Sequence, residues 1–370
     1  MELIQESKPT AGVLHWFTTG VGRLLVSLLV PVITFVVMWQ VFIFLREGDA
    51  PKLITVAVAI VWGVGGVALL YVLSNWVVDQ LPGQLQAQLR PYVFVGPALV
   101  ILGWYLLLPT VRTLYASFFD ARTANFVGLD NYIFAFTDPK MLESFRNNLM
   151  WLIIGTFFAV AFGLVIAILA DRSRFETIAK SLIFMPMAIS FVGAGVIWRF
   201  IYAYKPPGVE QIGLFNAVLT TFGLEPQAWL TLRPWNNLFL ILILIWLQTG
   251  YAMVLLSAAL KGVPQELLEA GRIDGANEVQ IFFSILIPYI QGTIVTVATT
   301  IIILTLKIFD IIFVMTNGNF GTEVMASMQY KQMFRFTHFG RGGAVAIVLL
   351  IAVIPVMWYN LRQFGEGRAF

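Results

Sequence analysis

The sequence contains no cysteine, only two histidines and few charged residues. Asp, Glu, Lys and Arg make up 12% of its 370 residues, about half of what soluble domains carry. Without cysteine there is no disulfide framework, no thiol nucleophile and no cysteine metal site. His15 and His338 lie far apart in the sequence and beside no nucleophile pattern, so we interpret them as interfacial polar residues. Nothing here supports a metal or thiol enzyme.

A phosphate-binding loop is also missing. The chain has no Gly-rich loop followed by Lys and Ser or Thr, the pattern that cradles nucleotide phosphates. The net charge of +3 is small and gives no reason to expect a nucleic-acid partner. Residues 1–20 have no cleavable signal pattern, because no short apolar core precedes a small-residue cleavage site.

Apolar residues are abundant instead: 59% of the chain is hydrophobic, and the mean hydropathy is +0.84. A spanning helix needs about 20 mostly apolar residues, and backbone groups in lipid must be paired within helices. The apolar runs do not alternate with polar residues, as barrel strands would. We therefore predict an all-α polytopic membrane protein with about eight transmembrane helices, near residues 24–45, 53–78, 93–111, 149–170, 182–203, 238–260, 285–314 and 344–361.

The polar stretch Asp79–Arg90 separates two groups of predicted helices. We expect residues 1–90 to form an amino-terminal extension with two transmembrane helices and a linker, and residues 91–370 to form a core of six helices. Glycines at 63, 65 and 66 in the second helix favour close helix packing.

The most informative polar stretch, residues 264–288, lies between two long apolar runs. Its charges cannot stay in lipid, so we expect a loop outside the membrane. Gln265–Arg272 has the pattern of a short helix with Pro264 at its first position, where proline is tolerated. Gly275 suits a left-handed turn, and Asn277 can cap a second helix. The stretch is predicted to fold as helix, tight turn, helix.

This stretch resembles the signature loop of bacterial ABC importer permeases, which reads E-A-A, three residues, G, nine residues, I-x-L-P. The matching residues are Glu269, Ala270, Gly271, Gly275, Ile285, Ile287 and Pro288. Two of them depart from the pattern, because Gly271 replaces Ala and Ile287 replaces Leu. The glycine weakens the helix by roughly 1 kcal/mol.

The resemblance implies a type I ABC importer permease fold, in which residues 261–284 form a cytoplasmic loop that docks onto an ATPase subunit. It implies that the coupling residues are Glu266, Glu269, Ala270, Gly271, Arg272, Asp274, Gly275 and Ala276. ATP and Mg are then expected on the ATPase, so this chain is expected to hold no cofactor or metal and to be no enzyme. The implied partners are a second permease subunit, a cytoplasmic ATPase dimer, an extracytoplasmic sugar-binding protein, a sugar and the lipid bilayer.

Other segments resemble the carbohydrate-importing, maltose-type branch. Sugars need hydrogen bonds and aromatic faces rather than formal charge. Residues 246–251 resemble a W-L-x-x-x-Y segment that lines the sugar site, residues 186–191 resemble a helix break, and position 305 matches a polar position. The implied substrate-pathway residues are Met187, Ser190, Phe191, Trp246, Gln248, Tyr251 and Thr305. For each of them, packing within the bundle is the alternative explanation.

The segment Lys307–Glu323 looks most like the α-glucoside branch of these permeases. That likeness favours a disaccharide such as an α-linked glucoside or trehalose, or a glucosylated osmolyte. The alternative from another class is a stand-alone secondary carrier or channel for a small polar solute. A carrier needs ionisable residues within the membrane, and Lys307 and Asp310 are the nearest to such a pair. Because they lie three apart on one predicted helix, we interpret them as a local ion pair.

The expected location is the bacterial inner, or plasma, membrane, with both termini cytoplasmic because eight spans return the chain to one side. Counting the lysines and arginines of the loops does not by itself support this orientation. The short basic loop Asp171–Lys180 does support it. The expected orientation therefore rests mainly on the family resemblance.

Overall fold

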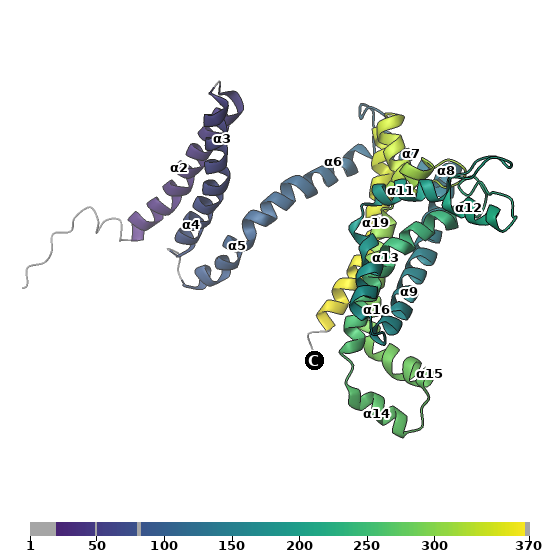
Figure 1. Cartoon of the computed structure of the whole chain (residues 1–370). Helices are drawn as coiled ribbons and strands as arrows, with labels where there is room; N and C mark the ends of the chain where they lie inside the picture. The colour runs from purple at the N-terminus through teal and green to yellow at the C-terminus, as the bar shows by residue number, and fades with distance from the viewer. Residues whose placement is uncertain (1–19, 49, 80–82, 367–370) are drawn as a thin grey trace, which may run out of the picture. The chain divides into compact units, whose positions relative to one another are not determined.

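The computed structural model describes residues 20–48, 50–79 and 83–366, and the side chains of residues 20–28, 31 and 363–366 are outside this description. His15 and the other residues before 20 also lie outside it. Within the described ranges the regular elements are helices joined by loops, and the one extended pairing is an isolated bridge between Phe119 and Phe126. The chain divides into two compact units, Met1–Thr110 and Val111–Phe370, whose elements are labelled in Figure 1.

The first unit contains two antiparallel apolar helices and most of a third. Its elements are α2 Gly20–Glu47, α3 Lys52–Ile60, η1 Val61–Gly65, α4 Gly66–Asp79, α5 Gly83–Leu102 and η2 Gly103–Leu107. Close packing occurs at Gly66, where an added Cβ would lie 2.7 Å from the Met38 Cε, whereas Gly63 faces open space. The third helix begins at Gly83, so the prediction that it starts after Pro91 is wrong. The Gln- and Leu-rich residues before Pro91 favour helix, and Pro91 lies inside it.

The second unit begins within α6 and holds the remaining helices. They are α6 Leu108–Ala116, α7 Asp130–Thr137, α8 Pro139–Met150, η3 Trp151–Gly155, α9 Thr156–Asp171, α10 Glu176–Phe184, η4 Met185–Ala188, α11 Phe191–Ile201, α12 Leu214–Thr221, α13 Asn236–Lys261, α14 Gln265–Ile273, α15 Glu278–Ile281, η5 Phe282–Leu286, α16 Ile287–Leu306, α17 Asp310–Met315, α18 Met325–Tyr330, η6 Lys331–Arg335 and α19 Phe339–Glu366. In Figure 1, α14 and α15 project from one end of this bundle, and α7, α8 and α12 lie toward the other end.

Six helical stretches of the described residues are long and apolar enough to cross a membrane, and α10–η4 with α11 makes a seventh if this pair is one span bent by 103°. The first predicted span, 24–45, falls within α2. The prediction of an all-α, multi-pass membrane protein is confirmed. The predicted interruption of the fifth span at Pro186 is also confirmed, because η4 contains this proline.

The predicted span 285–314 is wrong at its carboxyl end, because the helical stretch, which runs from Glu278, ends at Leu306. Lys307 directly follows the last residue of α16, and Asp310 begins α17, so the two residues do not share a helix. Within the described ranges Lys307 and Asp310 do not form the ion pair that was predicted. The break is stabilised from outside the segment, because the Asn148 side-chain amide donates to the Leu306 carbonyl at 3.2 Å.

The core of the second unit is built on α13. Leu240, Ile241 and Leu244 are fully buried there, and an apolar helix without a polar face is typical of such a position. Its neighbour α9 comes very close, because a Cβ added at Gly163 would lie 2.5 Å from the Ala252 Cβ. This packing makes α13 the fixed element on which the surrounding helices are placed.

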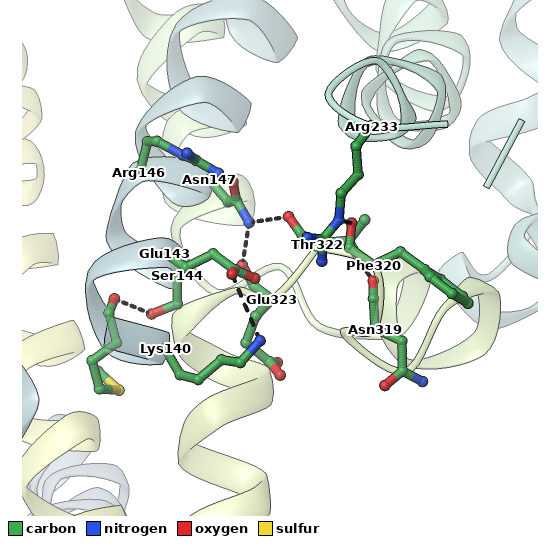
Figure 2. A network of polar contacts seen from close by, with 12 residues as sticks. Lys140, Glu143, Ser144, Arg146, Asn147, Arg233, Asn319, Phe320, Thr322 and Glu323 are labelled. Carbon is green, nitrogen blue, oxygen red and sulfur yellow. Dashed lines mark hydrogen bonds and ion pairs between the residues drawn. The ribbon is translucent and has the colours of Figure 1, made fainter. Parts of the chain in front are cut away.

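The loop between α17 and α18, residues 316–324, is held by polar side chains of α8, of α13 and of the segment before α13, and Figure 2 shows the contacts of Asn147 and Arg233. The buried Asn147 amide donates to the carbonyls of Gly321 at 2.9 Å and Glu323 at 2.8 Å. Asn237 donates to the Gly321 carbonyl at 3.0 Å, and the Arg233 Nε donates to the Phe320 carbonyl at 2.6 Å. The loop is therefore a fixed part of this end of the bundle.

Beside this loop, His338 ends the turn that precedes α19. Its Nδ1 accepts the Arg341 backbone N–H at 3.2 Å. Burial and the nearby Arg341 charge lower the pKa of the imidazole, which keeps His338 neutral at pH 7. The structure thus gives this histidine a local role at the start of α19.

Candidate functional site

The signature loop folds as a helix, a tight turn and a second helix, as the sequence predicts. Gly275 has φ +82°, and Asn277 closes a capping box with Gln280 through bonds of 2.9 and 2.8 Å. The second helix continues through η5 into α16. Pro264 precedes α14 with ψ 134°, so it is the residue before the helix and not, as predicted, its first position.

The predicted coupling residues differ in exposure. Seven of them are exposed or half-buried, and these are Glu266, Glu269, Ala270, Arg272, Asp274, Gly275 and Ala276. Gly271 is buried against the second helix, where an added Cβ would lie 2.6 Å from the Ile285 Cδ1. Glycine in place of the motif's alanine therefore lets the two arms of the loop approach closely.

Sequence reasoning missed an apolar side chain at the tip of the loop. Ile273, the last residue of α14, is 85% exposed, and Leu267 on the same helix is 43% exposed. Glu269 lies between them without a hydrogen bond or ion pair to the rest of the described chain. An isoleucine this exposed within a polar loop is accessible to a partner, and the residue lies two positions after the E-A-A positions.

A cavity of about 250 Å³ opens where the break in the fifth span meets α13 and α16. Its wall is formed by Met187, Ile189, Phe191, Leu247, Gln248, Tyr251, Thr300 and Leu304. Four of the seven predicted substrate-pathway residues are among them. Gln248 is only 5% exposed, yet its amide has no hydrogen-bond partner in the described part of the chain. Its amide atoms are not among the fully buried polar atoms that lack a partner; they face the cavity and are available to a ligand there.

The other three predicted pathway residues lie elsewhere. Ser190 caps α11 by accepting the Gly193 backbone N–H at 3.0 Å. Trp246 packs edge-to-face on Trp198, with ring centroids 5.7 Å apart. Thr305 is fully buried and donates to the Ile301 carbonyl at 2.7 Å. Thr300, and not the predicted Thr305, is the threonine of α16 that lines the cavity. The residues around the two threonines in the sequence do not indicate which of them would face the cavity.

The wall of this cavity carries no formal charge. It offers the Gln248 amide, the hydroxyls of Tyr251 and Thr300, and the aromatic rings of Phe191 and Tyr251. Neutral donors and acceptors beside aromatic rings suit a neutral polyhydroxylated ligand, because such a ligand needs hydrogen bonds and stacking surfaces. Lys307 and Asp310, the residues considered for a carrier, are not part of the wall.

The helices around the two sites define the fold of an ABC transporter permease. A chain of a bacterial alginate ABC transporter, solved in complex with an alginate-bound periplasmic protein, matches with a TM-score of 0.65. The match covers 75% of this chain and 94% of that chain at 18% sequence identity. The predicted fold is confirmed.

The chain belongs to the family of binding-protein-dependent transport system inner membrane components, whose model matches residues 159–362. The osmoprotective compounds uptake permease protein GgtC of Synechocystis sp. is 58% identical over 74% of this chain and 98% of its own length. The alpha-glucoside transport system permease protein AglF of Rhizobium meliloti is 52% identical over 74% of this chain and 82% of its own length. The chain is therefore an importer permease subunit and not a stand-alone carrier or an enzyme.

Proposed function

We propose that this chain is one of two membrane subunits of an ATP-driven importer and that its signature loop docks onto an ATPase dimer. In this proposal ATP and Mg bind the ATPase, and a second permease subunit completes the pathway. An extracytoplasmic binding protein delivers the solute at the opposite end of the bundle. The loop then faces the cytoplasm, as do both termini. The α14 surface supports docking, because Glu266 and Glu269 are exposed on it and the apolar Ile273 at its end is 85% exposed outside the apolar spans.

The proposed solute is a neutral sugar that contains an α-linked glucose, such as a disaccharide or a glucosylated osmolyte. The observation that carries this proposal is the uncharged, partly aromatic wall around Gln248 and Tyr251. The names of the two relatives add support, since one takes up osmoprotective compounds and the other transports alpha-glucosides. Within the cavity we assign hydrogen bonding to Gln248, Tyr251 and Thr300, and stacking to Phe191.

A substitution at Glu269 tests the coupling role without disturbing the fold. The Glu269 side chain is exposed and has no partner elsewhere in the described residues, so Glu269→Ala should leave the melting temperature unchanged. In the reconstituted complex, uptake of radiolabelled trehalose should fall roughly tenfold or more, the scale of one coupling free energy. The matched control is Glu225→Ala, an exposed glutamate in the loop that precedes α13, at the other end of the bundle. Unchanged uptake by the Glu269 variant would show that the loop does not couple transport to the ATPase.

A further inference from the structure

A cluster of polar and charged side chains joins the loop after α9 to the end of α13. The Lys180 Nζ donates to the Asp171 carboxylate, to Glu176 at 2.6 Å and to the Ser257 hydroxyl at 2.5 Å. The Ser257 hydroxyl donates to Asp171 at 2.7 Å, and the Lys261 Nζ donates to Glu176. We call these residues the α9–α10 cluster.

The cluster is balanced in charge and partly shielded from water. It contains two carboxylates and two ammonium groups, and the side chains of Lys180 and Asp171 are only 18% and 17% exposed. A solvated loop that merely reverses the chain would leave these groups in water. Removing one partner from such a cluster leaves the others with unpaired charge, so its members hold the helix ends together as one unit.

The cluster is connected to both arms of the signature loop. Lys261 is the last residue of α13, and residues 262–264 alone separate it from α14. On the other arm, Glu278 accepts from the Arg272 Nε at 3.1 Å and pairs with Arg172 at 3.6 Å. Arg172 directly follows Asp171, so a displacement of α14 acts on the α9–α10 cluster through two routes.

The cluster is also connected to the cavity. Along α10 and η4, Lys180 precedes the cavity residue Met187 by about 10 Å of helix, and along α13 Tyr251 precedes Ser257 by about 9 Å. α10 and α13 also touch at Gly250, directly before the cavity residue Tyr251, where an added Cβ would lie 2.5 Å from the Ile183 carbonyl oxygen. The two helices are therefore fixed to each other at the cluster and again near the cavity.

We propose that Lys180 and Glu176 are positioning residues that make α10 move together with the signature loop, so that a displacement of α14 reaches the cavity wall at Met187. The proposal rests on the proposed function, because it names the residues through which the ATPase would act. It assigns Lys180 the central position, since this side chain bonds to three members of the cluster, Asp171, Glu176 and Ser257.

The absence of cysteine from the sequence allows a direct test on the purified chain. Cysteines introduced as Ile178→Cys on α10 and Leu267→Cys on α14, both exposed positions, carry spin labels whose separation is measured by pulsed electron paramagnetic resonance. We expect one narrow distance distribution in the labelled parent chain, a broadened one in Lys180→Met, and a narrow one again in Lys180→Arg. The control is Lys140→Met, an exposed lysine on α8 that pairs with Glu143 at 3.7 Å. A distribution in Lys180→Met as narrow as in the control overturns the proposal.

The functional readout is trehalose uptake per ATP hydrolysed by the complete complex in proteoliposomes. Lys180→Met should lower this ratio roughly 2- to 30-fold, the range of couplings altered by remote mutations, and Lys261→Met should lower it less because Lys261 contacts Glu176 alone. A role confined to folding would reduce uptake and hydrolysis together and leave the ratio unchanged, which would refute the coupling role. If the wild-type complex shows no ATP-dependent uptake, the proposed function fails, and the distance measurement still decides on the link between α10 and α14.

Discussion

Replacing Asn147 tests how the loop at residues 316–324 is held. Its fully buried amide donates to two backbone carbonyls at 2.9 and 2.8 Å (Figure 2). In Asn147→Leu both bonds are lost, and the carbonyls of Gly321 and Glu323 lose a donor. A net bond contributes about 1 kcal/mol and a buried unsatisfied group costs about 1–3 kcal/mol, so we expect a destabilisation of about 2–4 kcal/mol.

The assay is the thermal midpoint of the purified chain in detergent, followed by limited proteolysis of the loop. A loss of this size corresponds to a midpoint lower by roughly 5–10 °C for a unit of this length, with faster cleavage between α17 and α18. Asn319→Ala is the matched control, because Asn319 lies in the same loop, is exposed and bonds through its side chain to no other described residue. If the two variants melt at the same temperature, the loop does not depend on Asn147.

Two further substitutions test the cavity and the packing beside it. Gly250→Ala would bring a Cβ within 2.5 Å of the Ile183 carbonyl oxygen and 2.7 Å of the Phe184 Cα, so a melting assay should show a destabilisation of about 1–3 kcal/mol. The control is Gly292→Ala, which meets nothing within 4 Å and should not lower the melting point. Equal melting points for the two variants would contradict the close approach of α10 and α13. Gln248→Leu should leave the melting point unchanged, because the amide has no partner within the described residues. It should raise the trehalose concentration for half-maximal uptake roughly 5- to 150-fold, because a sugar hydroxyl left without its partner in the bound state costs about 1–3 kcal/mol, and an unchanged value would remove Gln248 from the sugar site.

The features that the sequence predicted well depend on local chemistry. The turn of the signature loop follows from Gly275, which tolerates a positive φ, and from Asn277, which caps the helix that follows it. Gln248 and Tyr251 were grouped correctly because residues three apart share a helix face. The break at Pro186 follows from a missing backbone donor.

The features that the sequence did not predict depend on packing between distant segments. The end of α16 is fixed by Asn148, which supplies a donor from α8 to the Leu306 carbonyl. A prediction from hydropathy cannot detect this contact, and it therefore placed the end of the span at residue 314. Thr300 and Thr305 are chemically equal, and only the placement of α16 turns one toward the cavity. Residues 171–180 were interpreted as a basic loop because the sequence does not show which side chains pair. Lys180 bonds to Asp171 and Ser257 only where three helices meet in the folded chain.

The central claim is that α14 and its turn receive the energy of transport from an ATPase. The most direct test is to purify this chain from its native membrane under mild conditions and to determine which proteins accompany it. The account predicts a second permease subunit and two ATPase subunits in stoichiometric amounts, with the ATPase subunits lost and the second permease subunit retained when Ile273, the exposed tip of α14, is changed to Asp. A lone chain or homo-oligomer that transports the sugar without an ATPase would contradict it.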